Sequence, residues 1–162
     1  MIIMGTRVHR GAKETYRFYD TDTEFCTIDG MRFGDLRTVL LRRTDRAPVL
    51  TLCSTYDAEE TLIRGSERVV VDAADGTVVT RLRMKSLEET TFDDRYLIRG
   101  DSRVVRIWDL ERRDEPTAVF SLQPLGRGKF VGGVDRYVFM CDNTIDEKLQ
   151  LAFLLYPAIR FI

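Results

Sequence analysis

Histidine and cysteine are scarce in this chain of 162 residues. The only histidine is His9, in the N-terminal segment, and the sequence shows no partners that would pair it into a catalytic triad or a metal site. The three cysteines, Cys26, Cys53 and Cys141, are odd in number and widely spaced. That spacing argues against a disulfide framework or a cysteine-rich metal site, and it favours buried thiols in a reducing compartment. We therefore expect no catalytic residues, no metal and no cofactor.

An excess of either charge is also lacking. Lys and Arg number 25 against 26 Asp and Glu, which gives a formal net charge of −1. A nucleic-acid-binding domain normally carries a basic surplus, so no nucleic-acid partner is expected. The basic residues are nearly all arginine, because only four of the 25 are lysine.

Long hydrophobic runs are absent. The N-terminal run, Met1–Met4, is too short for a secretory signal. The C-terminal run is interrupted by Pro157 and Arg160, and it is shorter than the roughly 20 residues that cross a bilayer. We expect no transmembrane segment and an intracellular, cytoplasmic protein, with peripheral membrane contact as one option.

The chain instead consists of short segments rich in β-branched and aromatic residues, most of them bounded by Gly, Asp or Pro. Asp75-Gly76 predicts a type I′ hairpin between two of them. Residues 1–13 show no periodicity and are predicted to form a flexible N-terminal arm. The predicted strands are Glu14–Asp20, Glu24–Asp29, Leu36–Arg42, Val49–Cys53, Glu60–Arg64, Arg68–Asp72, Thr77–Met84, Arg95–Arg99, Arg103–Asp109, Ala118–Leu122 and Arg136–Cys141, with a further short one at Lys129–Val131.

The sequence also repeats itself. The tetrapeptide Leu62–Gly65 recurs as Leu97–Gly100, 35 residues later. The segments that follow also match, so that Glu67–Leu82 corresponds to Ser102–Leu122. A weaker copy precedes them from Phe25. This period raises the possibility of a propeller. Three full units of about three strands are too few for one, because a propeller closes with four to eight blades of four strands.

A helix is predicted near residues 144–156, where a fourth repeat begun at Arg136 breaks off. From Leu149 to Tyr156 only Gln150 is polar, and a helix that is apolar all round must be enclosed. Eleven or twelve strands and one apolar helix fit a closed barrel with the helix inside. The predicted fold is therefore mainly β: a single domain, residues 14–162, with an antiparallel barrel of about 12 strands around a hydrophobic C-terminal helix.

Repeated strand, Asp/Gly turn and strand units that end in a hydrophobic helix resemble the tubby C-terminal-like superfamily. The pattern is most similar to the LURP-one-related proteins and the phospholipid scramblases, and Glu67–Met84 is its best local match. The resemblance implies the barrel with a central helix, and a domain that recognises phosphoinositides or other anionic lipids. The cysteine-rich segment and the acidic calcium-binding spacing of the scramblases are missing, so neither scramblase activity nor a calcium site is carried over.

Two basic groups are candidate anion-binding sites. Arg81, Arg83 and Lys85 alternate along one strand and form a basic row on one face, where they are suited to a phosphate or a lipid headgroup. A solvated outer face is the alternative. The second group is Arg127 and Lys129 in the glycine-rich stretch Gly126–Gly133, with Arg136 near its far end. That stretch lacks the P-loop spacing, and an ordinary connection between strands is the alternative.

Two other polar motifs have structural interpretations. The stretch from Asp20 to Glu24 is not an EF-hand, because Phe25 stands where the loop needs glycine. Thr144 and Glu147 are spaced as a capping box for the C-terminal helix.

Trp108 is either a core anchor or a surface recognition residue, with core favoured.

We therefore expect a non-enzymatic binding or adaptor domain that recognises anionic phospholipid headgroups or a membrane surface. The alternative is a protein interaction or scaffolding domain without a small ligand, which the near-zero net charge favours. An enzyme that uses carboxylates or arginine at an open barrel mouth is a third hypothesis.

Overall fold

The barrel wall consists of twelve antiparallel strands. The computed structural model describes residues 1–10, 13–33, 36–43, 47–55, 66–84, 89–101, 103–112, 114–124 and 135–156. The strands are β1 (Ile2–Arg10), β2 (Lys13–Asp20), β3 (Thr23–Phe33), β4 (Leu36–Arg42), β5 (Pro48–Thr55), β6 (Ser66–Asp72), β7 (Val78–Met84), β8 (Thr90–Phe92), β9 (Tyr96–Gly100), β10 (Val104–Asp109), β11 (Ala118–Pro124) and β12 (Asp135–Cys141). Each strand pairs with its neighbours in the chain, and β1 pairs with β12 to close the barrel. The predicted fold class is confirmed.

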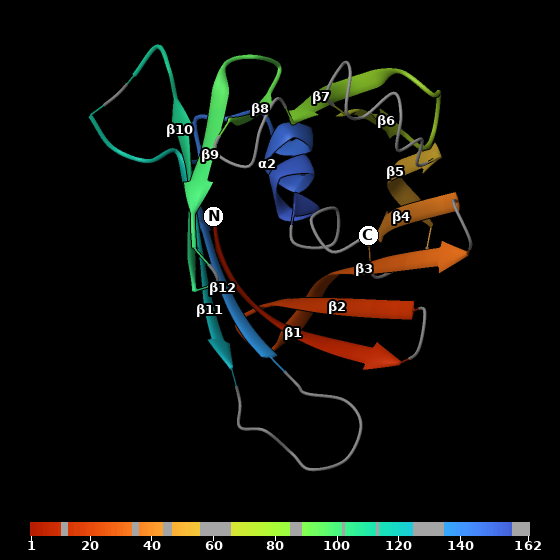
Figure 1. The fold of residues 1–162 in the computed structure, drawn as a ribbon. Coiled ribbons are helices and arrows are strands. Elements are labelled where there is room, and N and C mark those ends of the chain that lie inside the picture. Colours follow the sequence, from red (N-terminus) through yellow and green to blue (C-terminus); the bar gives the residue numbers. More distant parts are fainter. Residues whose placement is uncertain are drawn as a thin grey trace.

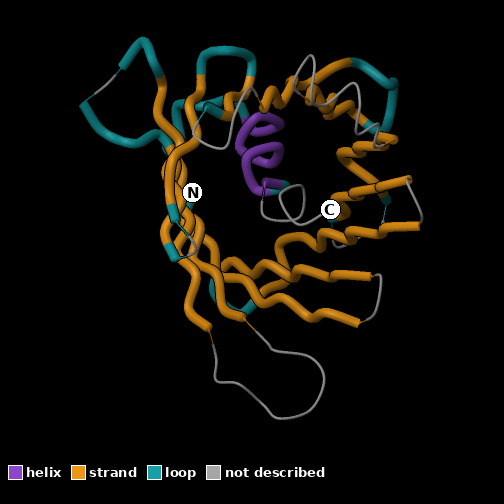
Figure 2. The backbone as a smooth tube through the Cα atoms, viewed as in Figure 1, coloured by secondary structure: helices purple, strands orange, loops and turns teal. Residues whose placement is uncertain are grey.

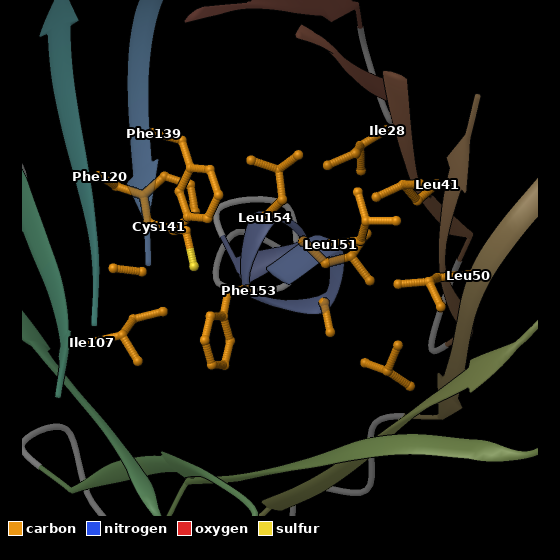
Figure 3. Close-up of a cluster of buried hydrophobic side chains, with 14 of the residues drawn as sticks. Ile28, Leu41, Leu50, Ile107, Phe120, Phe139, Cys141, Leu151, Phe153 and Leu154 are labelled. Atoms are coloured by element: carbon orange, nitrogen blue, oxygen red, sulfur yellow. The ribbon is translucent and has the colours of Figure 1, made fainter. Parts of the chain in front are cut away.

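The helix α2 (Glu147–Leu154) lies inside this wall (Figures 1 and 2). Ala152, Phe153 and Leu154 are completely buried. Figure 3 shows Leu151, Phe153 and Leu154 pointing in different directions toward side chains from opposite parts of the wall. A barrel of this strand number is too wide for its own side chains to fill, so the helix supplies the missing apolar volume.

Aromatic contacts hold the helix to one part of the wall. The ring of Phe153 lies 5.1 Å from that of Phe92 in β8 and 5.2 Å from that of Tyr96 in β9, measured between centroids. Such tilted and edge-on pairs contribute stabilisation beyond the area that they bury.

The start of the helix is capped by Asp146, not by Thr144. The Asp146 carboxylate accepts hydrogen bonds from the backbone N–H groups of Lys148, at 3.0 Å, and Leu149, at 3.3 Å. Thr144 lies in the preceding turn, where its own N–H donates to Asp142 at 2.9 Å. The predicted capping box is therefore wrong, because the turn moves the helix start two residues further along the chain. Lys148 also pairs with the nearly buried Asp72 of β6, and this pair ties the helix start to the wall.

The N-terminal segment is part of the wall. Residues Ile2–Arg10 form β1, which pairs with β2 on one side and β12 on the other. The prediction of a flexible arm at residues 1–13 is therefore wrong, and the barrel domain includes β1. Apolar residues on both sides of this strand hide its alternation: Ile3 is buried, whereas Ile2 and Met4 are exposed. Gly5 faces inward, and a Cβ at this position would collide with the ring of Phe18.

The structure also differs from the predictions in one turn and one short strand. The hairpin at Asp75-Gly76 is present, but of its two central residues only Gly76 has a positive φ, so it is not a type I′ turn. Two successive positive φ values occur at Asp93 and Asp94, between β8 and β9. The three-residue β8 is too short to show periodicity and was not predicted. The predicted strands Glu60–Arg64 and Lys129–Val131 lie outside the described residues.

Hydrogen bonds between Arg95 and Asp109 join the start of β9 to the end of β10. Arg95 donates from Nε to Asp109 Oδ1 at 3.0 Å and from Nη2 to Asp109 Oδ2 at 2.8 Å. The Asp109 side chain is only 5% exposed. These hydrogen bonds from Arg95 lower the pKa of the Asp109 carboxyl below its usual value, and the backbone N–H of Glu111 contributes in the same direction.

Leu154→Asp should yield no soluble folded protein, because an unpaired charge would be placed at the centre of the barrel. Leu154→Ala should fold but lower the free energy of unfolding by about 2–5 kcal/mol, because it leaves a cavity. Denaturant unfolding followed by circular dichroism measures the loss. A soluble Leu154→Asp variant that unfolds cooperatively would show that the helix is not enclosed.

Asp109 should make stability depend on pH. Because its folded pKa is lowered, the carboxylate stabilises the fold above about pH 4, and this contribution is lost as the pH falls through the folded pKa. Asp109→Asn lacks that contribution at every pH. The difference in free energy of unfolding between wild type and variant should therefore shrink from about pH 6 to about pH 3. A difference that stays constant over this range would contradict the assigned role.

Candidate functional site

The predicted basic row on β7 is engaged in ion pairs. Arg81 and Arg83 lie on the outer face, as predicted, while Leu82 between them is buried. Arg81 Nη1 donates to Glu67 Oε1 at 2.9 Å, and Arg83 Nε donates to Glu67 Oε2 at 2.7 Å. Arg83 also pairs with Asp94. The hydrogen bonds from Arg83, and then Arg81, lower the pKa of Glu67, so two carboxylates balance the charge of the two arginines.

The six predicted site residues are not all brought together. Arg136 lies on β12. Four strands lie between β12 and β7 on the shorter way round the barrel. Lys85, Arg127 and Lys129 lie outside the described residues. Anion binding by these residues stays a prediction, and among those that the structure describes only Arg136 is without an ion pair.

A second basic surface, around Arg136, was not predicted. It covers the outer side of β9, β10, β11, β12, β1 and β2, which follow one another in the wall. We call it the arginine–apolar face. Its arginines are Arg17, Arg99, Arg106 and Arg136, and its apolar residues include Ile2, Met4, Val119, Val138 and Met140.

Cross-strand register brings the apolar residues of the face together. Ile2 lies opposite Met140, and Met140 lies opposite Val119. Met4, the next outward residue on β1, lies between Val138 and Tyr19. Ile2 is 67% exposed, Met4 56% and Met140 43%. Contiguous exposed apolar residues with a polar rim mark surfaces that meet a protein or a membrane.

The arginines of the face form two pairs at its edges. Arg99 and Arg106 lie directly opposite each other on β9 and β10. Arg17 and Arg136 flank Thr6, the register partner of both, so their strands are about 10 Å apart. All four side chains are exposed, and none forms an ion pair in the part of the chain that the structure describes.

Carboxylates are missing from this surface. Among the described outward side chains of β9 to β12, β1 and the Thr15–Tyr19 part of β2, none is Asp or Glu. The carboxylate that acts on Arg106 is that of Asp101, in the turn between β9 and β10. It accepts hydrogen bonds from the backbone N–H groups of Val104 and Arg103, which are the main cause of its lowered pKa. Apart from Asp101 at this turn, the described residues of the face therefore present positive charge without an acidic partner.

Trp108 lies at the edge of the same face. It points outward with Arg106, while Ile107 between them is buried, and its side chain is partly covered. The interpretation as a core anchor is therefore wrong, because the alternation of β10 places Trp108 on the outside.

The described residues show no group of three or more His, Cys, Asp or Glu side chains that could hold a metal ion. Burial raises the pKa of the Cys26 and Cys141 thiols to about 12, so both are protonated and unreactive. No helix among the described residues has the length and apolar character that crossing a bilayer requires.

Comparison with protein-family models, with curated proteins and with solved structures gives no match. The resemblance to the tubby-like proteins therefore rests on the repeats, the barrel and the enclosed helix, and membership of that superfamily stays a prediction.

The pair of Arg99 and Arg106 should cost the fold some stability. Like charges directly opposite each other on neighbouring strands repel. Arg99→Gln should therefore leave the free energy of unfolding unchanged or raise it by a few tenths of a kcal/mol, with a larger gain at low salt. Thermal unfolding at two salt concentrations measures this. A loss of about 1 kcal/mol or more would show that Arg99 has a structural role instead.

Proposed function

We propose that this protein is a non-enzymatic binding domain that contacts the anionic surface of a phospholipid membrane through the arginine–apolar face. The observation that carries the proposal is four exposed arginines, without a carboxylate among them, around exposed apolar side chains. Membership of the tubby-like superfamily, a cytoplasmic location and an adaptor role belong to the same proposal.

Electrostatics supports an anionic surface as the ligand. Each basic residue close to an anionic leaflet contributes about 1 kcal/mol, and the effect falls off within a Debye length. Arg136 lies on β12, and Arg17 and Arg106 lie on strands two places from it in the wall, so these three can approach one surface together. Arg99 lies on β9, a quarter of the way round the barrel from β12. The protein as a whole has a net charge of −1, so the attraction comes from how the charge is distributed.

A protein partner is the second candidate. Methionine, tyrosine, tryptophan and arginine are enriched at protein interfaces, whereas lysine and acidic residues are depleted. Met4, Met140, Tyr19 and the arginines give the face this composition. The partner would have to be acidic to match the four arginines.

Vesicle flotation at low salt tests the proposal. The protein should float with vesicles of phosphatidylcholine and phosphatidylserine, and it should not float with phosphatidylcholine alone. Arg17→Gln/Arg136→Gln should lower the partition coefficient about 30-fold, because two contributions of about 1 kcal/mol are lost.

The matched control is Arg81→Gln/Arg83→Gln, which changes the net charge by the same amount but acts on arginines paired with Glu67 and Asp94. It should change the partition coefficient by about twofold or less. Equal flotation with both kinds of vesicle would overturn the lipid proposal. An equal loss in the two double variants would show that net charge, and not this face, determines binding.

A further inference from the structure

We infer that Ile2, Met4 and Met140 insert into the interfacial layer of the membrane between the two arginine pairs. The face would then recognise a bilayer surface and not a single headgroup. This inference rests on the proposed function and specifies how the same face binds.

The exposed apolar residues are concentrated at one place. The described residues include four large hydrophobic side chains that are strongly exposed. Three of them, Ile2, Met4 and Met140, are neighbours on β1 and β12, and the fourth, Val78, lies on β7. Exposure of these three to water is unfavourable, and transfer to an apolar environment removes that cost in proportion to the area covered.

The spacing of the arginines argues against one headgroup as the ligand. Arg106 lies two strands from Met140 in the same row, and Arg136 lies four residues from Met140 along β12. With strands about 4.8 Å apart and a rise of about 3.4 Å per residue, the Cα atoms of Arg106 and Arg136 are roughly 17 Å apart. One phosphate can bridge the arginines within a pair, whereas it reaches one arginine of each pair only if both side chains are extended toward it. Several anions side by side match this spacing better, and an anionic leaflet presents them.

The order of the side chains fits a layered environment. Arginine has a long apolar stem, so its guanidinium can stay at the level of the headgroups while shorter apolar neighbours go deeper. Stable attachment of a peripheral protein commonly needs both apolar insertion and basic residues. The arginine–apolar face carries both components on adjacent strands of a closed wall.

The test compares Ile2→Thr/Met4→Thr with Val78→Thr. Thr has a high strand propensity and all three positions are exposed, so the variants should fold, and circular dichroism checks this. Binding to phosphatidylserine vesicles should fall about tenfold or more in Ile2→Thr/Met4→Thr at both low and high salt, while its salt dependence stays that of the wild type. Val78→Thr should bind like the wild type. Met140→Thr serves as the second variant if the double variant does not fold.

Two further measurements separate a surface from a headgroup. Vesicles with phosphatidylserine and vesicles with a phosphoinositide should bind the wild type equally at matched total charge, and a soluble inositol phosphate should not displace it. Trp108, the only tryptophan, should shift its emission to shorter wavelength on the vesicles.

The outcomes distinguish the two claims. If the wild type does not bind anionic vesicles, both the proposed function and this inference fail, and an acidic protein becomes the expected partner. If the wild type binds but Ile2→Thr/Met4→Thr binds equally well, or an inositol phosphate displaces it, only the insertion inference is overturned.

Discussion

Burial of α2 is the constraint on which the barrel depends. Twelve strands enclose more space than their inward side chains fill, and the apolar residues Leu151–Leu155 at the end of the helix are all buried. The wall and the helix therefore each cover apolar surface that the other would leave exposed. Closure of β1 on β12 also leaves the wall without a free edge. With the centre filled and the edges paired, the outer side chains are the part of the described wall that can meet a partner.

Much of this fold follows from local patterns. Strand β4 begins and ends where the sequence predicts, because Val39 and Leu41 are buried and alternate with less buried neighbours. The enclosed helix follows from the single polar residue, Gln150, within its apolar stretch. The capping residue of the helix and the types of the turns could not be predicted, because they depend on hydrogen bonds that form only in the folded chain. Asp146 and Thr144 are both good capping residues, and only the turn at Asp142 decides between them.

The arginine–apolar face could not be predicted because the outer side of β1, which lies within it, is partly apolar. Strand prediction relies on a polar outer side, and Ile2 and Met4 remove that contrast from β1. The residues that make the face unusual are therefore those that hid the strand. The face also joins β1 to β12, which are far apart in the sequence, so no local motif contains it. By contrast, the row of Arg81 and Arg83 is plain in the sequence, but its partners Glu67 and Asp94 are not.

The most direct test of the account locates the membrane on the protein. Methyl signals of the wild type can be recorded by NMR with nanodiscs that contain phosphatidylserine and a lipid with a paramagnetic headgroup. The account predicts strong broadening of the Ile2, Met4 and Met140 methyl signals, with the Val78 methyl signals, on β7, unaffected. Broadening centred on Val78, or none at any of the four residues, would contradict it.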